Sequence, residues 1–564
     1  MSTIRVAAVQ FASGTDVDAN LATCLRMIDQ AAEHRPNLIV LPEFCNRLSW
    51  YKTQNDVFDT AVAIGGDFLQ AIGDKACEHT VFVVINCTIQ RADGQATVTS
   101  ILFDDNGNRI AEADKQTLMG HENSRFARAT RHAPVLETSL GTLGMYACRD
   151  GVTMETPRSL AIRGAQLLCN SLNSFAFDEA ELHVPVRAPE NRVFVVAANK
   201  VGPLIPEQLL EPTAAALGVP ADLLYGAGES QIVAPDGTVL AKAPRSGEAV
   251  VVADIDLSLA SNKLRPDGTD MIASRRGALY RPISEPPIDA HDHFSAEKIT
   301  AAVYQPISNG VTAIGEACGE IMQINTLDLL VLPELFCFEN GVITDPKACH
   351  ELSTIALQRL QDAIGEQQTL VCTTLVEKDG GDYFHTAYLI GRTGIVHKQR
   401  QLHRCERHAW AALGDTIETV DLPWGRLGLI VGDDSIYPEV AKVLAIQGAD
   451  VLAIPFDVQE AWETQLGLVD RSAENRVCLV AATRPKPVGS SLIITQHEEF
   501  QIFTNWQKRP FNGTINEPIV TRVSAEMGMT LAEIHPTTAK HKVMSANTDL
   551  IQGRAWQLAD ILTK

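Results

Sequence analysis

Residues 38–44 read Leu-Ile-Val-Leu-Pro-Glu-Phe, and residues 329–335 read Leu-Leu-Val-Leu-Pro-Glu-Leu. A second pair of similar stretches begins at Arg187 and at Arg471, which are 284 residues apart. These stretches read Arg-Ala-Pro-Glu-Asn-Arg-Val and Arg-Ser-Ala-Glu-Asn-Arg-Val. Self-similarity on this scale predicts that the chain consists of two copies of one structural unit.

Within each copy, short β-branched runs alternate with longer amphipathic stretches. Residues 20–33 place apolar side chains at helical spacing, whereas residues 81–85 are typical of a buried strand. The pattern predicts an α/β fold in which helices are layered on sheets. A polar segment that contains proline and histidine separates the copies and is typical of a linker. The predicted first copy, linker and second copy are residues 1–284, 285–298 and 299–564.

Composition narrows the function. The 564 residues carry a net charge of −22, so the chain offers no broad basic face and nucleic acid is not an expected partner. Apolar runs fall short of the ~18 residues that a membrane span needs, and the N-terminus begins as a strand instead of a signal peptide. The 12 cysteines are scattered without Cys-x-x-Cys pairs, as in reduced cytosolic proteins. We therefore expect a cytoplasmic protein without a membrane segment.

Three residues of the first copy form a candidate nucleophile set. Glu43 follows a buried strand and a proline, Lys115 follows a turn, and Cys148 follows the strand-like residues 143–147. A thiol with a pKa of ~8.5 needs a base or a cation to react near neutral pH, and this set supplies both. Taken singly, the cysteine is as well explained as a small buried hydrophobe, and the glutamate as a hydrogen-bonded strand end.

Taken together, these residues resemble the nitrilase superfamily of carbon-nitrogen hydrolases. The resemblance is carried by five motifs in order, namely Leu-Pro-Glu43, Lys115, Gly144–Asp150, Arg187–Asn191 and Gly228–Gly237. It implies two tandem four-layer αββα sandwiches that pack as an internal pseudo-dimer, with further homo-oligomers open. It also implies that neither a metal nor an organic cofactor is required.

The resemblance further implies the role of each residue. Cys148 resembles the nucleophile, Glu43 the general base, Lys115 the cation on the oxyanion side, and Glu122 an additional active-site carboxylate. Attack of the thiolate would give a thioester that water hydrolyses. A Cys-x-Asp order after the nucleophile favours an amide or carbamoyl substrate. A nitrilase, an acyltransferase on the same thioester and a non-catalytic scaffold remain alternatives.

Five further residues are candidate substrate contacts, each with a structural alternative. Arg149 would bind a substrate carboxylate or else form a salt bridge. Trp50 and Tyr51 would wall an apolar substrate or simply pack. Asn173 and His183 would approach the pocket or fill buried polar roles.

The second copy lacks the nucleophile. The positions 284 residues after Cys148, Lys115 and Glu122 are Gly432, Gln399 and Glu406. Without a nucleophile, acyl transfer by this route cannot occur, so we expect a non-catalytic domain. Residues 512–562 contain no interpretable motif, and docking onto the first copy is one interpretation of them.

Overall fold

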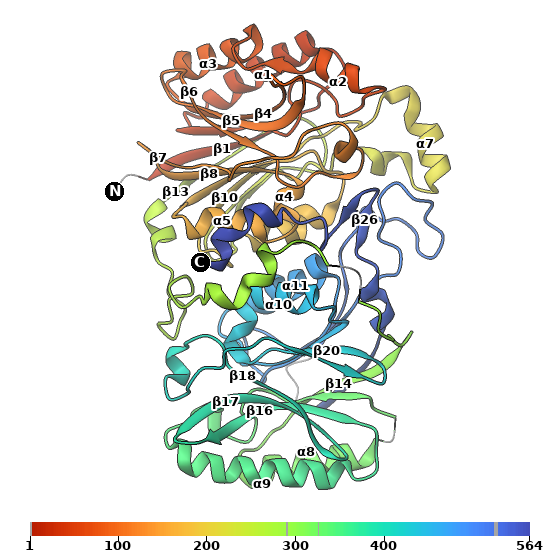
Figure 1. Cartoon of the computed structure of the whole chain (residues 1–564). Helices are drawn as coiled ribbons and strands as arrows, with labels where there is room; N and C mark the ends of the chain where they lie inside the picture. The colour runs from red at the N-terminus through yellow and green to blue at the C-terminus, as the bar shows by residue number, and fades with distance from the viewer. Residues whose placement is uncertain (1–2, 289–290, 325, 524–527) are drawn as a thin grey trace. The chain divides into compact units, whose positions relative to one another are not determined.

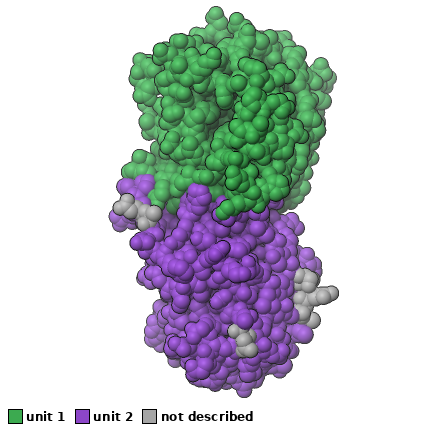
Figure 2. Space-filling view, turned by 90° about the vertical axis from the view of Figure 1, so that its right-hand side faces the viewer, with its two compact units in different colours: residues 1–263, 499–516, 543–561 green, residues 264–498, 517–542, 562–564 purple. Residues whose placement is uncertain are grey.

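The chain divides by internal contacts into two units, which are coloured separately in Figure 2. The computed structural model describes residues 3–288, 291–324, 326–523 and 528–564. Unit 1 holds residues 1–263, 499–516 and 543–561, and unit 2 holds residues 264–498, 517–542 and 562–564. Two segments from the far end of the chain therefore belong to unit 1. Residues 289–290 of the expected linker lie outside the described residues.

Unit 1 contains two mixed sheets. The seven-stranded sheet has the order β13-β1-β2-β4-β5-β6, with β3 paired to β4. Its strands are β1 (Ile4–Gln10), β2 (Leu38–Val40), β3 (Val62–Ala63), β4 (Phe82–Gln90), β5 (Ala96–Phe103), β6 (Arg109–Asp114) and β13 (Ala249–Ile255). The six-stranded sheet has the order β12-β11-β10-β9-β8-β7. Its strands are β7 (Val135–Thr138), β8 (Gly141–Ala147), β9 (Leu167–Ser171), β10 (Phe194–Ala198), β11 (Gln231–Val233) and β12 (Val239–Lys242).

Side-chain alternation along the strands builds the layers. In β2, Ile39 packs with the outer helices, whereas Leu38 and Val40 pack between the sheets with β8 and β10. Figure 1 shows α1 and α3 on the outer face of the first sheet and α5 beyond the second. The helices are α1 (Val17–Ala32), α2 (Gln54–Thr60), α3 (Asp67–His79), α4 (Arg149–Val152), α5 (Glu155–Ile162), α6 (Val184–Val186) and α7 (Leu210–Leu217).

Unit 2 repeats this arrangement. Its sheets have the orders β18-β17-β16-β15-β14-β25 and β19-β20-β21-β22-β23-β24. The first comprises β14 (Ile299–Gln305), β15 (Leu329–Val331), β16 (Leu370–Asp379), β17 (Asp382–Gly391), β18 (Gly394–Arg400) and β25 (Gly528–Ile534). The second comprises β19 (Thr419–Leu422), β20 (Gly425–Leu429), β21 (Val451–Pro455), β22 (Cys478–Ala482), β23 (Leu492–Thr495) and β24 (Ile519–Arg522). The helices are α8 (Gly310–Gln323), α9 (Pro346–Ile364), α10 (Pro438–Ile446) and α11 (Leu468–Asn475).

The closing strands show that the two units share one topology. β13 pairs antiparallel with β1, and β25 pairs antiparallel with β14 in the same way. The prediction of two tandem α/β sandwiches is confirmed, while their packing as a pseudo-dimer stays a prediction. Among the described residues, no helix combines the length and the apolar character that crossing a membrane requires.

Candidate active site

Glu43 lies just beyond the carboxyl end of β2. Its backbone N–H donates to the carbonyl of Leu172, which follows β9, at 3.0 Å. The next residue, Phe44, has a left-handed φ of 55°, and its carbonyl accepts from the Lys200 ammonium at 3.0 Å. The turn therefore directs the Glu43 side chain into the interior, where it is 1% exposed.

Lys115 connects two buried carboxylates. It follows β6, and its Nζ donates to Glu43 Oε1 at 2.8 Å and to Glu122 Oε2 at 2.9 Å. Glu122 is fixed in turn by the backbone N–H of Met119 at 2.9 Å. Two buried acids and one buried base thus form a single hydrogen-bonded cluster with one formal negative charge when all three ionise.

This arrangement shifts the acid–base properties of the cluster. Burial, together with the charge of Glu122, raises the pKa of Glu43 to about 7 against the opposing charge of Lys115. Burial works against the charge of Lys115, but Glu122 and Glu43 outweigh it and raise the pKa of the ammonium well above its usual value. Lys115 therefore keeps its proton near neutral pH, whereas Glu43 can gain or lose one.

Cys148 occupies a sharp turn between β8 and α4. Its backbone lies at φ 42° and ψ −106°, a strained conformation of the kind that clusters at functional sites. The turn is held because the Cys148 N–H donates to the Ser171 carbonyl at 2.9 Å. Burial, and then the charges of Glu179 and Glu43, raise the pKa of the Cys148 thiol well above its usual value. The resting side chain is thus a protonated thiol that needs a base.

Asp150 and Arg187 hold the segment that follows the Cys148 turn. The Asp150 carboxylate accepts from the backbone N–H groups of Gln116 at 3.1 Å and Thr117 at 2.7 Å, which joins α4 to the segment after Lys115. Arg187 donates from Nε to the Gly151 carbonyl at 2.9 Å and forms an ion pair with Glu190 at 2.6 Å. These residues position the site without lining it.

A cavity of about 730 Å³ opens onto the cluster. Of the nine sequence candidates, six line it, namely Glu43, Trp50, Tyr51, Glu122, Cys148 and Asn173. Lys115 is not among the described lining residues, but it bonds Glu43 and Glu122, which are. Arg149 and His183 are not among the described lining residues. Arg149 is 1% exposed and its guanidinium faces Thr153 at 3.4 Å, while His183 faces Asp178 at 3.9 Å.

Sequence reasoning missed much of the lining. Phe175, Leu204, Ile205, Leu224 and residues 501–504 contribute to it, as do His121 and Arg125 and residues 543–547 except Met544. The inserted segment between Val201 and Gly226, which contains α7, supplies three of these side chains. Its length was a usable signal, since long insertions are often functional. The C-terminal segments carried no motif.

The corresponding site of unit 2 is built differently. Gly432 has the same left-handed backbone as Cys148, with φ 48°. The constant offset of 284 is wrong between these motifs, because Asp434 accepts from the amides of Leu402 and His403 as Asp150 does from Gln116 and Thr117. Gln401 and His408 therefore correspond to Lys115 and Glu122, not Gln399 and Glu406. His408 and Arg407 both bond Glu334, the latter at 3.1 Å.

These contacts change the pKa of Glu334. Although burial opposes it, the charges of Arg407 and His408 lower the pKa of Glu334 to about 2. Ligand atoms of Glu334, His385 and His408, all three of them buried, lie within 4.8 Å of one another, a spacing that could hold a metal ion. The Arg407 guanidinium on Glu334 opposes a cation there.

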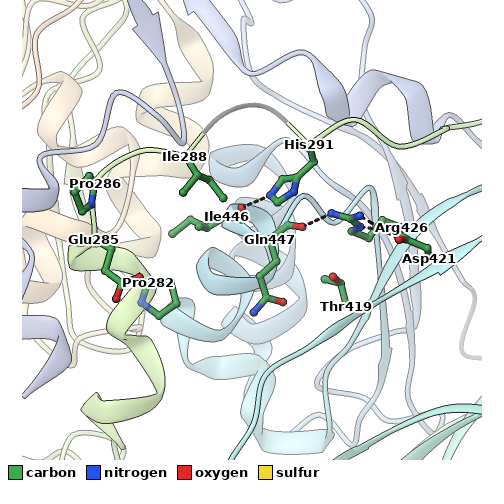
Figure 3. Close-up of a pocket in the computed structure, with 10 residues that line it drawn as sticks. All are labelled: Pro282, Glu285, Pro286, Ile288, His291, Thr419, Asp421, Arg426, Ile446 and Gln447. Carbon is green, nitrogen blue, oxygen red and sulfur yellow. Dashed lines mark hydrogen bonds and ion pairs between the residues drawn. The ribbon is translucent and has the colours of Figure 1, made fainter.

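A separate cavity, lined by residues of unit 2 and drawn in Figure 3, has a volume of about 480 Å³. The Arg426 guanidinium on its wall donates to Asp421 at 2.7 Å and to the Gln447 carbonyl at 2.8 Å, and the His291 ring bonds the Ile446 carbonyl at 2.8 Å. These polar groups are paired with the protein itself, and the described lining contains no cysteine or serine nucleophile.

Comparisons with known proteins show what this chain is similar to. A family model described as carbon-nitrogen hydrolase matches residues 5–263 and again residues 300–508. A nitrilase of Pyrococcus abyssi is 28% identical over 264 residues, covering 47% of this chain and 93% of that protein. An N-carbamoylputrescine amidase of Arabidopsis thaliana is 23% identical over 292 residues, covering 49% of this chain and 94% of that protein. The crystal structure of an amidase from Nesterenkonia sp. covers 49% of this chain and 95% of its own, with 23% identity and a TM-score of 0.39.

Proposed function

Because the chain belongs to the carbon-nitrogen hydrolase family of the nitrilase superfamily, we propose that unit 1 hydrolyses an amide or carbamoyl substrate through a thioester on Cys148. The observation that carries this proposal is the buried cluster of Glu43, Lys115 and Glu122 beside the strained Cys148 turn, at the base of one cavity. A nucleophile, a base with a pKa near 7 and a fixed cation are what acyl transfer to a thiol requires.

In the first half-reaction, Glu43 takes the thiol proton as the sulfur of Cys148 bonds to the carbonyl carbon. The N–H of Arg149, at the start of α4 and without a partner in its own helix, and the charge of Lys115 stabilise the oxyanion. The carbon–nitrogen bond then breaks, and Glu43 returns the proton to the departing amine or ammonia.

In the second half-reaction, Glu43 takes a proton from a water molecule while the oxygen of that water attacks the thioester carbon. The carbon–sulfur bond breaks, a carboxylic acid or carbamic acid leaves, and the proton returns to the Cys148 sulfur. Lys115 stays charged throughout because its pKa is high. Besides stabilising the oxyanion, Lys115 fixes the direction and the proton affinity of Glu43.

Unit 2 is proposed to be non-catalytic. It has Gly432 in place of the thiol, and a glutamate with a pKa of about 2 is a weak base. A Cβ at Gly432 would lie 2.5 Å from Glu334 Oε2, so a cysteine side chain would meet the Glu334 carboxylate, which would have to move.

Release of ammonia from primary amides, carbamoyl amino acids and nitriles tests the proposal. We expect release from an amide or carbamoyl compound by the wild type, none by Cys148→Ala, and unchanged release by Cys77→Ala, which removes an exposed thiol. Turnover of nitriles alone would favour a nitrilase. Formation of a hydroxamate with added hydroxylamine, at the expense of the acid, would favour acyl transfer. Release that survives Cys148→Ala would contradict the proposal.

A further inference from the structure

The catalytic cavity of unit 1 has one wall made by the far end of the chain. Residues 501–504 line it, together with Val543, Ser545, Ala546 and Asn547, and Glu43 and Cys148 line the same cavity. Both segments belong to unit 1 by their contacts. We call these two lining segments the C-terminal wall.

The first segment of the C-terminal wall is attached beside the catalytic strands. The Asp178 carboxylate accepts from the backbone N–H groups of Ile515 at 3.1 Å and Asn516 at 2.6 Å. The Phe177 N–H donates to the Gly513 carbonyl at 2.8 Å. Asp178 and Phe177 lie in the segment that follows β9, so the wall is joined to the same strand whose Ser171 carbonyl holds the Cys148 turn.

The second segment is attached to the turn that carries Glu122. It is a hairpin of β26 (Val543–Ser545) and β27 (Thr548–Asp549), turned at Asn547 with φ 56°. The Thr548 hydroxyl oxygen accepts from the Gly120 N–H at 2.8 Å. The Ile502 N–H donates to the Met544 carbonyl at 2.8 Å and joins the two segments. The wall is therefore braced on both sides of the reacting groups.

The chemistry of the cavity differs between its ends. Glu43, Glu122 and Cys148 stand at the reacting end, while the remainder is dominated by apolar side chains. These are Trp50, Tyr51, Phe175, Leu204, Ile205, Leu224, Ile502, Phe503 and Val543. Polar residues are interspersed among them, namely Ser49, His121, Ser124, Arg125, Asn173, Gln501, Thr504, Ser545 and Asn547. A cavity of about 730 Å³ exceeds what a small amide such as propionamide fills and is the size of pockets for much larger ligands.

Phe503 is the residue of the C-terminal wall whose exposure and backbone conformation are the most unusual. Phe503 is 51% exposed and belongs to the cavity lining, and the centroid of its ring lies 6.1 Å from that of Phe175. Its backbone has a left-handed φ of 60°, which is rare for an aromatic residue. Strained, exposed aromatic side chains in a cavity are typical of binding surfaces.

We propose that the C-terminal wall selects amides whose non-reacting group is a bulky apolar chain or ring, with Phe503 as the principal specificity-determining contact. The proposal rests on the proposed function, since it assigns the substrate class of the same Cys148 site. The far end of the chain is then a part of the active site and not an appendage of the second repeat.

A graded series of primary amides tests the wall. We expect the wild type to prefer 3-phenylpropionamide over propionamide in kcat/KM. Phe503→Gly removes the ring and replaces it with a residue that adopts a left-handed backbone without strain, so the variant should fold. We expect Phe503→Gly to lower kcat/KM about tenfold for 3-phenylpropionamide and less than twofold for propionamide. Ile502→Ala should act in the same direction. Phe294→Ala, which removes a phenylalanine that is 69% exposed elsewhere, is the matched control and should change neither value.

Alkylation of Cys148 separates the two proposals, because it needs no turnover. Iodoacetamide and N-phenethyl iodoacetamide are compared by intact mass, with Cys148→Ala identifying the signal of this thiol. A preference for the bulky reagent that falls in Phe503→Gly supports the wall. If hydrolysis occurs but the selectivity ratios of wild type and Phe503→Gly agree in both assays, the wall is overturned. If the alkylation preference is present but no amide is hydrolysed, the proposed function fails while the wall stands.

Discussion

Replacing Glu122 by glutamine would show how the buried charges set the base. Glu43 and Glu122 bond the same Lys115 Nζ, at 2.8 and 2.9 Å. At an effective dielectric constant of about 20, two unit charges about 6 Å apart repel by about 3 kcal/mol, equivalent to about two pH units. The charge of Glu122 is one of the causes that raise the pKa of Glu43 to about 7. Its removal should therefore lower that pKa.

The sign follows from the role of the base. Glu43 must be ionised to accept the thiol proton, so activity rises with pH through a midpoint near its pKa, about 7 in the wild type. In Glu122→Gln the midpoint should move one to two pH units lower, because the repulsion between the two carboxylates is lost. The maximal rate should fall at the same time, since the amide no longer neutralises Lys115.

The midpoint is best read from the pH dependence of Cys148 alkylation by iodoacetamide, which reports the base even if Glu122→Gln turns over slowly. The surface variant Glu137→Gln removes an exposed acid and should leave the midpoint unchanged. A midpoint in Glu122→Gln that stays near 7 or moves to higher pH would refute the assignment of Glu43 as a base tuned by Glu122.

Three further outcomes are expected. Thr548→Val removes the acceptor of the Gly120 N–H, so kcat should fall about fivefold, the equivalent of about 1 kcal/mol, with an unchanged fold by circular dichroism; an unchanged kcat would separate the hairpin from catalysis. Asp150→Ala leaves buried amide N–H groups unpaired and should lower the free energy of unfolding, measured in urea, by about 3 kcal/mol; a loss below about 1 kcal/mol would contradict the bracing role. Gly432→Cys in a Cys148→Ala background should release no ammonia, because a Cβ there meets Glu334; any thiol-dependent release would show that unit 2 retains a working base.

The sequence was sufficient for the tandem fold because its repeats fall at strand ends. Leu-Pro-Glu follows β2 and β15, so the repeated motif marks the same strand end in both units. Glu43, Glu122 and Cys148 come together because each follows a strand or turn with its own backbone anchor. These are local signals, which can be recognised in a single sequence.

Other parts of the site depend on long-range geometry. The Arg149 guanidinium contacts Thr153 and does not belong to the described cavity lining, which its position next to Cys148 in the sequence does not reveal. The C-terminal wall depends on backbone contacts such as those at Asp178, which need no particular residue type in the segment they hold. The offset between the repeats also changes between the Lys115 and Cys148 motifs, and hydrogen bonds rather than spacing identify Gln401 as the counterpart of Lys115.

Comparing the two units shows which properties of the site depend on its side chains and not on the shared backbone. Cys148 and Gly432 share the same left-handed backbone turn, at φ 42° and 48°, and each stands beside a buried glutamate after a Leu-Pro pair. Glu43 shares one ammonium with a second carboxylate and has a pKa of about 7, whereas Glu334 bonds a guanidinium and an imidazole and has a pKa of about 2. The ratio of buried negative to positive groups around the glutamate therefore decides whether it exchanges protons near neutral pH. Restoring a thiol alone would not restore the reaction, because a base this acidic would give the thiol proton no stable place to go.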